Sequence, residues 1–431
     1  AKIINYSAFC IPEVSSKVTD KDDALRMGFN RNEGRFELLN EYGLTKFVQR
    51  LQDEKQEVPE LLTTMIKLKQ EPYDSASSRA YNHEAGMKFI SRGAGVRRLG
   101  DHKKYANPLS RNFAATIWQF NDEPREQKIL CCEFHTKANA LNADAMKILE
   151  ESVIRLEQDN YQGLVVYNEA MNFSAGADLN TMIGLADVKD WKGIDKYLSD
   201  FQSACMKMKY ASKPTVSAVA GLAIGGGFEV VLHCDYNVAH TNVVLGLVES
   251  LVGLIPAGGG CKEMLWRWLQ TPEGKENSEH ASMKVFDLIG YAITATSPNE
   301  ALPNQFFLEK DKVVINRDRQ LSTAIDLLNN IEGGYEKPSQ PKFNLGGSAV
   351  RDKMFEKLEA LYNENKILDH GLEVGKQIAF VLSGGNTNID NELSEDDLYN
   401  LELEAFMRLI QMPKTQERIK HTLETGKPLV N

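Results

Sequence analysis

A strand-like run that leads into three consecutive glycines is the feature that most constrains the fold of this chain. Residues 215–219 are small, apolar or β-branched, and residues 223–229 (AIGGGFE) follow them and open a further apolar run. This order predicts a strand, a tight turn and a helix, with free backbone N–H groups at the positive end of the helix dipole. Glycines there also let a ligand approach the backbone. Taken alone, the segment fits a site for developing negative charge and a tightly packed turn about equally well.

Two further segments combine small or apolar residues with a single acid. Residues 173–179 (FSAGADL) follow a strand-like run, and Asp178 could cap a following helix, so in isolation this segment favours a simple strand-to-helix turn. Residues 246–256 (GLVESLVGLIP) are nearly all apolar apart from Glu249. Because burying a lone charge is costly, we expect Glu249 to be exposed at a helix start, paired or functionally poised.

The middle of the chain alternates between two sequence patterns, one typical of strands and one typical of helices. Helical spacing of apolar residues, as over residues 145–156, separates short runs of strand-like composition. This alternation is typical of an α/β fold. The strand-like runs are residues 116–120, 129–134, 163–167, 215–219 and 236–239.

Composition changes mark the expected domain boundaries. Residues 1–75 carry apolar stripes at helical spacing, and residues 76–109 are polar and basic, which indicates a linker or exposed loop. A Gly- and Pro-rich stretch near residue 334 precedes another helical pattern. We therefore expect a helical domain over residues 1–75, a linker over 76–109, the α/β domain over 110–333 and a helical domain over 334–431.

Composition also excludes several classes of partner. A net charge of −10 argues against nucleic acid and against an anionic membrane surface. No apolar stretch approaches the ~20 residues of a membrane-spanning helix. Six scattered cysteines without a CxxC pair favour reduced thiols, so we expect a cytoplasmic protein. None of the eight histidines has metal-ligand spacing, which predicts no metal site, and His233 is expected to be a core residue.

Together, the three segments around Asp178, Glu229 and Glu249 resemble the crotonase (enoyl-CoA hydratase/isomerase) superfamily over about residues 110–330. Residues 137–142 (KANALN) are similar to the segment of that family that lines the coenzyme A (CoA) site. The resemblance implies an α/β fold with a crotonase-like core of repeated ββα units. We expect this core to be flanked by all-α domains at both ends.

The resemblance also implies roles for individual residues. The backbone N–H groups of Ala177 and Gly226 would form an oxyanion hole, and Glu229 and Glu249 match the two catalytic carboxylates of true hydratases. The residues expected to bind CoA are Ala138, Ala140, Leu141, Ala175, Asp178 and Leu179.

The flanks resemble parts of larger proteins of fatty-acid oxidation. Residues 34–40 (GRFELLN) are similar to the helical C-terminal domain of 3-hydroxyacyl-CoA dehydrogenases, which usually have Pro where Arg35 stands. The C-terminal sequence resembles bacterial multifunctional fatty-acid oxidation proteins. Gly93-Ala94-Gly95 is followed by Arg98 where a dinucleotide-binding loop would have its third glycine, so we predict no Rossmann unit here. We expect the C-terminal portion of a longer protein, with NAD bound only by a dehydrogenase domain outside this chain and no cofactor within it.

The expected activity is hydration of a 2-enoyl-CoA, with one glutamate as base and the other as acid. Having both acids favours hydration over an isomerase, which needs a base but no activated water, and a non-catalytic scaffold role is the third alternative. The expected partner is an acyl-CoA thioester. A homo-oligomer or a thiolase partner stays open.

Overall fold

The computed structural model describes residues 1–29, 31, 33–74, 79–103, 106–122, 127–158, 160–331 and 334–431. Two compact units are present, which we call the N-terminal unit and the main unit. The N-terminal unit comprises Ala1–Asn107, Glu169–Met171 and Asn316–Ser322, and the main unit comprises Pro108–Asn168, Asn172–Ile315 and Thr323–Asn431. The expected boundaries at residues 75–76 and 333 fall outside the described residues. In the described ranges, no helix has both the length and the apolar character that crossing a membrane requires.

The N-terminal unit combines helices with a small sheet: helices occupy most of residues 1–67, and the sheet follows them. Its apolar residues form a core of their own. Two of the three short antiparallel strands, at residues 79–82 and 86–89, lie in the region expected to be a linker, and Tyr73, Ala80 and Tyr81 of this sheet are buried. The elements are α1 (Lys2–Phe9), α2 (Val18–Phe29), α3 (Arg35–Tyr42), α4 (Leu44–Asp53), α5 (Glu60–Lys67), β1 (Tyr73–Asp74), β2 (Arg79–Asn82), β3 (Gly86–Phe89) and α6 (Leu99–His102).

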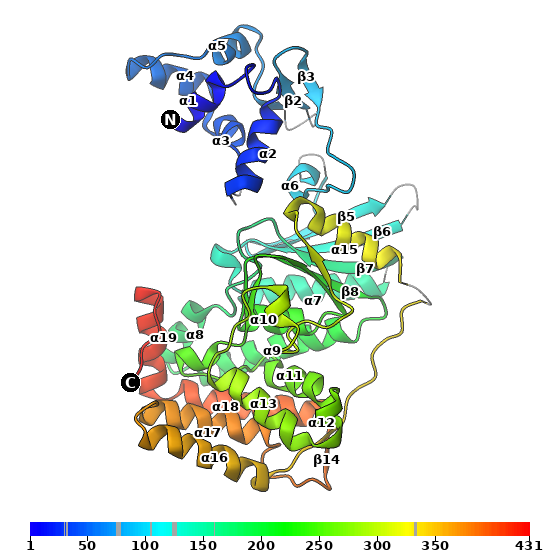
Figure 1. Cartoon of the computed structure of the whole chain (residues 1–431), viewed down its shortest axis with the longest axis vertical. Coiled ribbons are helices and arrows are strands. Elements are labelled where there is room, and N and C mark those ends of the chain that lie inside the picture. Colours follow the sequence, from blue (N-terminus) through cyan, green and yellow to red (C-terminus); the bar gives the residue numbers. More distant parts are fainter. Residues whose placement is uncertain are drawn as a thin grey trace. The chain divides into compact units, whose positions relative to one another are not determined.

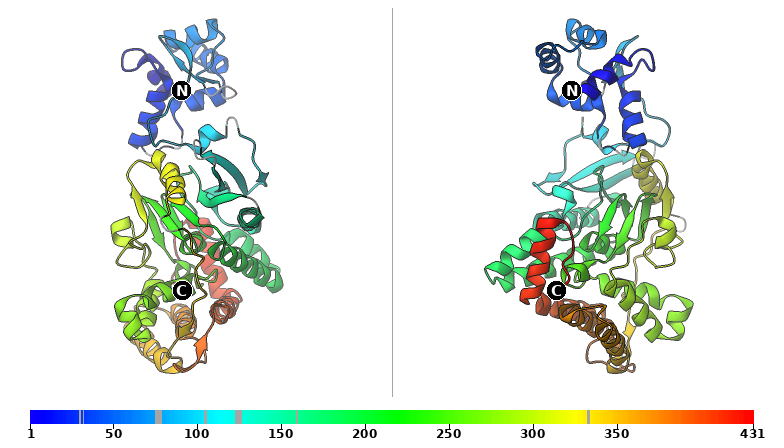
Figure 2. Two further views of the ribbon diagram at one scale, coloured as in Figure 1. Left: turned by 90° about the vertical axis from the view of Figure 1, so that its right-hand side faces the viewer. Right: turned by 60° about the vertical axis from the view of Figure 1, so that its left-hand side comes forward.

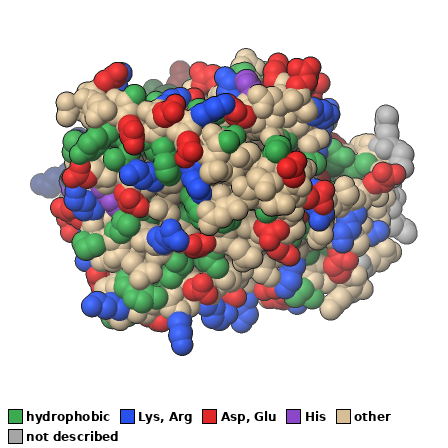
Figure 3. All heavy atoms as spheres, turned by 90° about the horizontal axis from the view of Figure 1, so that it is seen from below, with side chains coloured by type: hydrophobic (Ala, Val, Ile, Leu, Met, Phe, Trp, Pro, Cys, Tyr) green, Lys and Arg blue, Asp and Glu red, His purple; other side chains and the backbone are tan. Residues whose placement is uncertain are grey.

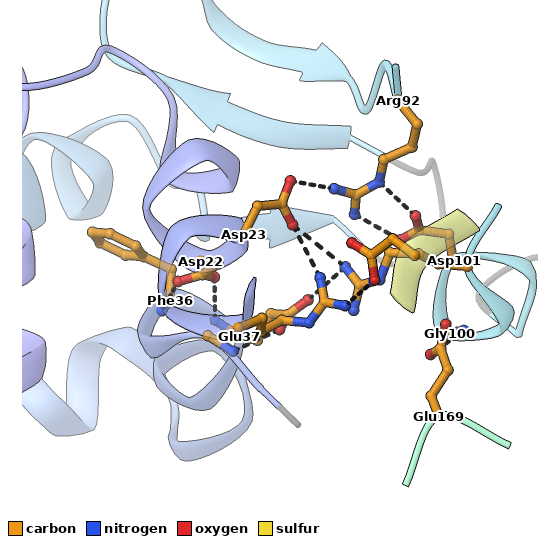
Figure 4. A network of polar contacts seen from close by, with 12 residues as sticks. Asp22, Asp23, Phe36, Glu37, Arg92, Gly100, Asp101 and Glu169 are labelled. Atoms are coloured by element: carbon orange, nitrogen blue, oxygen red, sulfur yellow. Dashed lines mark hydrogen bonds and ion pairs between the residues drawn. The ribbon is translucent and has the colours of Figure 1, made fainter. Parts of the chain in front are cut away.

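A buried aspartate on α2 caps the next helix. Helix α3 begins after Gly34, which has no side chain to accept a hydrogen bond. The Asp22 carboxylate, which is 1% exposed, accepts the backbone N–H groups of Phe36 and Glu37 at 2.9 Å each (Figure 4). These are two of the donors that a helix start otherwise leaves unsatisfied. The arrangement also places residue 35 at the first position of the helix, where proline is readily tolerated.

Ion pairs connect distant segments within the N-terminal unit (Figure 4). Arg92 bonds Asp23 at 2.7 Å and Asp101 at 2.8 Å. Arg26 bonds Asp318 at 2.7 Å, and the backbone N–H of Gly100 donates to Glu169 at 2.8 Å. The segments at residues 169–171 and 316–322 are therefore held in this unit by charge-assisted hydrogen bonds.

The main unit is built on a seven-stranded sheet in the order β12-β10-β8-β7-β6-β5-β4. Neighbours from β12 to β6 run parallel, while β5 is antiparallel to both β6 and β4. All five strand-like runs of the sequence lie on these strands, which confirms the α/β prediction. The strands are β4 (Ser110–Arg111), β5 (Ala115–Asp122), β6 (Gln127–Phe134), β7 (Tyr161–Tyr167), β8 (Thr215–Val219), β10 (Tyr236–His240) and β12 (Lys312–Val314).

Helices cover the sheet. Helix α7 (Ala143–Gln158) packs on β5, β6 and β7, and α9 (Trp191–Lys209) packs on α7 (Figure 2). The other helices after residue 170 are α8 (Leu179–Asp187), α10 (Gly226–Leu232), α11 (Gly260–Leu269), α12 (Pro272–Glu276), α13 (Ser278–Gly290), α14 (Pro298–Ala301), α15 (Gln320–Asn329), α16 (Ser348–Asn363), α17 (Asp369–Leu382), α18 (Glu395–Ile410) and α19 (Pro413–Thr425).

The C-terminal helices share the core of the main unit. Helices α16, α17 and α18 lie side by side next to α11 and α13 (Figure 1). Their apolar residues, such as Met354, Ile378 and Leu409, belong to the same buried cluster as the sheet. Residues 334–431 are thus part of one compact unit with the α/β core instead of a separate domain. On the face seen in Figure 3, acidic and basic side chains are interspersed with hydrophobic ones.

A buried ionic cluster joins α18 to this core. The fully buried Lys262 ammonium contacts Glu263 and, at 2.7 Å, Glu395 of α18. Lys209 of α9 bonds the same two carboxylates at 2.7 Å each. Two cations thus compensate two anions in a largely buried site.

We predict that Lys262→Met lowers the free energy of unfolding by about 3 kcal/mol, because removing one member of a buried ionic group leaves charge without compensation. Urea unfolding at pH 7 followed by circular dichroism measures the change. Lys353→Met, which removes a half-exposed partner of Glu279, is the matched control and should cost less than about 1 kcal/mol. Equal effects of the two substitutions would contradict the prediction.

Candidate active site

A second, small sheet brings the three acid-bearing segments together. Strands β9 (Leu222–Ile224) and β11 (Val244–Gly246) pair in parallel. On the other side of β9, Ser174 donates its N–H to Leu222 at 2.9 Å and accepts the N–H of Ile224 at 3.2 Å. Three segments therefore leave neighbouring strands at the same end of this small sheet, namely residues 173–179, 223–229 and 246–256.

The backbone N–H groups of Ala177 and Gly226 lie close together. Leu141 bridges to the residues on both sides of Ala177, which directs the Ala177 N–H away from Leu141. A Cβ added to Gly226 would lie 3.1 Å from the Ala177 nitrogen, and one added to Gly176 would lie 3.4 Å from the Gly226 nitrogen. Gly176 has a φ of +97°, which favours glycine. Gly226 opens α10, where first-turn N–H groups have no partner within the helix.

Glu229 projects from the first turn of α10 and is 4% exposed. Its Oε1 atom accepts the backbone N–H groups of Gly258 at 2.7 Å and Gly260 at 2.8 Å. Burial raises the pKa of Glu229 to about 7, and these two hydrogen bonds oppose the rise. The carboxyl group is therefore held in one orientation and changes protonation state near neutral pH.

Glu249 faces the same space from the opposite loop. It begins a 3₁₀ turn (Glu249–Val252), and its Oε1 atom would lie 3.0 Å from a Cβ added to Gly225. Its Oε2 atom is shielded from solvent and has no hydrogen-bond partner among the described residues. Burial and the negative charge of Glu229 raise the pKa of Glu249 well above its ordinary value. Both carboxyl groups are therefore held closer to the protonated form than an exposed glutamate is.

Both acids and both N–H groups border one mainly apolar cavity of about 320 Å³. The structure thus brings together Glu229, Glu249, Ala177 and Gly226, together with two of the residues expected to bind CoA, Ala175 and Leu179. A small, largely apolar cavity with a few convergent polar groups is typical of an enzyme active site.

The other four residues expected to bind CoA lie outside the lining of this cavity, and two of them, Ala138 and Leu141, hold its loop by backbone hydrogen bonds. Ala138 accepts the N–H of Ala175 at 3.1 Å, and Leu141 accepts the N–H of Asp178 at 3.0 Å. The Asp178 side chain caps α8 by accepting the N–H of Asn180 at 3.1 Å. Its predicted capping role is confirmed, whereas CoA binding by Ala138, Ala140, Leu141 and Asp178 stays a prediction.

Part of the cavity wall comes from the C-terminal helices, and this contribution was not predicted. Phe406 of α18 and Thr422 of α19 line the cavity, and α19 lies beside α8 (Figure 2). The apolar stripe of α18 was visible in the sequence, but nothing in it indicated which surface the stripe covers. The wall residues that lie outside the three acid-bearing segments are Met182, Tyr197, Leu198, Phe201, Ala257, Gly258, Phe406, Thr422, Gly426 and Pro428.

His233 is buried, as predicted. Burial lowers its pKa to about 3, so the ring is neutral. Its Nδ1 atom lies 2.7 Å from the carbonyl oxygen of Glu229 and its Nε2 atom 2.9 Å from the Tyr399 hydroxyl, which indicates donation from Nδ1 and acceptance at Nε2. Across the described ranges, no three His, Cys, Asp or Glu side chains converge as a metal site would require.

Comparison with known proteins gives the following matches. Residues 125–276 match the model of the enoyl-CoA hydratase/isomerase family. The chain is 29% identical over 436 residues to a "Probable 3-hydroxyacyl-CoA dehydrogenase" of Bacillus subtilis, a match that covers 99% of this chain and 53% of the relative. It is 26% identical over 424 residues to a "Putative fatty acid oxidation complex trifunctional enzyme" of Rickettsia felis. This match covers 96% of this chain and 51% of the relative. The chain spans about half the length of these curated relatives.

Among solved structures, an enoyl-CoA hydratase from Bacillus halodurans superposes with a TM-score of 0.46 at 16% identity. The superposition covers 70% of this chain and 98% of that one.

The raised pKa of Glu229 predicts a specific pH dependence of stability. The unfolded chain releases this proton near pH 4.5 and the folded chain near pH 7, so the folded state binds more protons between these values. The contribution of Glu229 to the free energy of unfolding is fully present below pH 4.5. It falls by about 3 kcal/mol as the pH rises to 7. We expect Glu229→Gln to remove this loss, so that the variant gains about 3 kcal/mol relative to the wild type between pH 4.5 and 8.

Urea unfolding at several pH values measures this difference. Glu356→Gln replaces an exposed carboxylate on α16 and should follow the wild-type curve. Parallel curves for Glu229→Gln and the wild type would show that the Glu229 pKa is not raised.

Proposed function

Because residues 125–276 match the model of the enoyl-CoA hydratase/isomerase family, we propose that this chain adds water across the double bond of a 2-enoyl-CoA to give a 3-hydroxyacyl-CoA. The observation that carries the proposal is that Glu229 and Glu249 border one cavity together with the N–H groups of Ala177 and Gly226. A single base would serve double-bond migration. Two acids at one cavity suit the addition of a water, because its proton must be taken up and another proton supplied.

In the proposed mechanism the two N–H groups bind the thioester oxygen. Their hydrogen bonds draw electron density toward that oxygen, which makes C3 of the enoyl group electrophilic. Negative charge then collects on the oxygen as water attacks. Preorganised donors of this kind are effective, since losing one typically costs ~10²–10³ in rate.

The two glutamates divide the proton transfers. Glu229, whose pKa is about 7, is the group that can act as a carboxylate and take a proton from the attacking water. Glu249, whose pKa is raised well above its ordinary value by burial and by the charge of Glu229, is the group that can supply a proton to C2. The oxygen of water bonds to C3 and a proton bonds to C2, and Glu249 regains its proton as Glu229 releases one. This division uses the separation of the two pKa values by their surroundings.

The whole protein has a wider proposed role. The relatives carry the names of a 3-hydroxyacyl-CoA dehydrogenase and of a trifunctional fatty-acid oxidation enzyme. We infer that this chain supplies the hydratase step of such a cytoplasmic multifunctional protein. The dehydrogenase step and its NAD would belong to a domain outside this chain. In the described region around Gly93 and Gly95, the preceding β1–β3 strands are antiparallel and no parallel βαβ unit is present.

We predict that Glu229→Gln and Glu249→Gln each lower kcat for hydration of crotonyl-CoA by about 10²–10⁴-fold, because the amide keeps the shape and loses the acid–base function. The KM should change less than about 3-fold. A spectrophotometric assay that follows loss of the conjugated enoyl thioester, with and without added NAD, measures the rates. The exposed Glu356→Gln is the control.

Near-normal kcat in either variant would remove that residue from the mechanism. Product analysis separates the related activities, because a hydratase forms 3-hydroxyacyl-CoA and an isomerase forms only a shifted double bond. Tight acyl-CoA binding without turnover at any chain length would favour a scaffold role.

The apolar wall of the cavity predicts a selectivity for acyl-chain length that a single substitution can change. Leu251 lines the cavity and is 42% exposed, so Leu251→Trp should narrow the cavity without disturbing the core. We expect kcat/KM for 2-decenoyl-CoA to fall at least about 10-fold relative to crotonyl-CoA, because a hydrophobic pocket discriminates by about 10-fold or more per methylene group. Leu302→Trp is the control, since Leu302 is also 42% exposed and lies outside the cavity lining. An unchanged ratio would place the acyl chain elsewhere.

A further inference from the structure

A third buried glutamate lies beside the two proposed catalytic ones, and it comes from the C-terminal part of the chain. Glu402 of α18 is fully buried, in the same helix stripe as the apolar residues Leu398, Ala405 and Leu409. Its Oε2 atom accepts the backbone N–H of Gly259 at 2.8 Å, and its Oε1 atom accepts the N–H of Lys262 at 2.8 Å. Both oxygens are thus occupied by one short loop.

The same loop holds Glu229. Gly258 and Gly260 donate to Glu229, while Gly259 and Lys262 donate to Glu402, so the two carboxyl groups share the start of α11 between them. Neighbouring groups pack closely against this loop. A Cβ at Gly258 would lie 2.6 Å from Glu229 Oε2, and one at Gly259 would lie 2.7 Å from the His233 ring. A displacement of the loop therefore moves the two donors that orient Glu229.

Helix α18 contacts the other side of Glu229 as well. The Tyr399 hydroxyl, one helical turn before Glu402, bonds His233, and His233 in turn bonds the backbone carbonyl of Glu229. Gln202 of α9 donates to Ala257 at 2.8 Å, next to the loop, and to the carbonyl of Tyr399 at 3.3 Å. The contacts of α18 thus reach both the backbone of Glu229 and the donors to its side chain.

On the basis of the function proposed above, we propose that Glu402 is a positioning residue for Glu229, which it serves by fixing the backbone N–H groups of residues 258–260. Glu402 does not border the cavity, so it acts on the reaction through Glu229 and not on the substrate. Helix α18, which carries it, is then part of the hydratase machinery. The energetic reason is that two backbone N–H groups, buried among apolar side chains, have Glu402 as their acceptor, and an unsatisfied buried donor is costly.

The test is a double-mutant cycle on hydration of crotonyl-CoA. After Glu402→Gln, the side chain has one oxygen that can accept a hydrogen bond, and its amide N–H₂ group faces the other backbone N–H donor. This mismatch arises whether the original carboxyl group is protonated or ionised. We expect Glu402→Gln to lower kcat by about 10–100-fold, since small misplacement of a reacting group has effects of this size, and to change KM less than about 3-fold. In the Glu229→Gln background, the same substitution should alter the residual rate less than about 2-fold.

Matched variants complete the experiment. Glu404→Gln lies two residues away on the exposed face of α18, where Glu404 pairs with Arg408, and it should leave kcat unchanged. If Glu402→Gln does not fold, Glu402→Asp keeps the carboxylate on a shorter arm and should show a smaller loss of kcat at an unchanged KM.

Two results would overturn the inference. The first is a wild-type kcat in Glu402→Gln, or in Glu402→Asp if Glu402→Gln does not fold. The second is an equal fold-loss of kcat in the wild-type and Glu229→Gln backgrounds. A wild-type chain without hydration activity would instead contradict the proposed function, which is a separate outcome.

Discussion

The hydrogen bonds from Gly258 and Gly260 to Glu229 are the interaction on which the rest of the site depends. A carboxyl group that is 4% exposed would otherwise be neutral and free to rotate among apolar neighbours. The two N–H groups offset part of the cost of burial, bring the pKa of Glu229 to about 7 and fix which oxygen faces the loop. The small second sheet, the glycines and the start of α11 all serve to bring these donors and the Ala177 and Gly226 amides to one cavity.

Several parts of this arrangement could be predicted from the sequence, because their signals are local. The run at residues 215–219 and the glycines after it define a strand, a turn and a helix start by themselves. Glu249 was conspicuous as one charge in an apolar run. The convergence of these segments came from a family resemblance and not from spacing alone, and the structure confirms that they border the same cavity.

The contributions of the C-terminal helices could not be predicted, because they depend on contacts between residues far apart in the sequence. The loop at Gly259 and its acceptor Glu402 are separated by more than a hundred residues. A local signal did exist: Glu402 falls on the apolar stripe of α18, as Glu249 falls in its apolar run, and a carboxylate in such a place needs a partner. The small sheet β1–β3 was missed for a different reason, since its strands are short and mostly polar and show no clear alternation.

The N-terminal unit is assembled from three separate pieces of chain, and this has a consequence for how the protein can be divided. Arg26 and the N–H of Gly100 bind Asp318 and Glu169, which belong to pieces that follow much later in the sequence. A shortened protein that started at residue 108 would keep those two acids and lose the groups that bind them. The most natural place to cut, judged by sequence alone, would therefore separate the segments at residues 169–171 and 316–322 from the groups that hold them in the N-terminal unit.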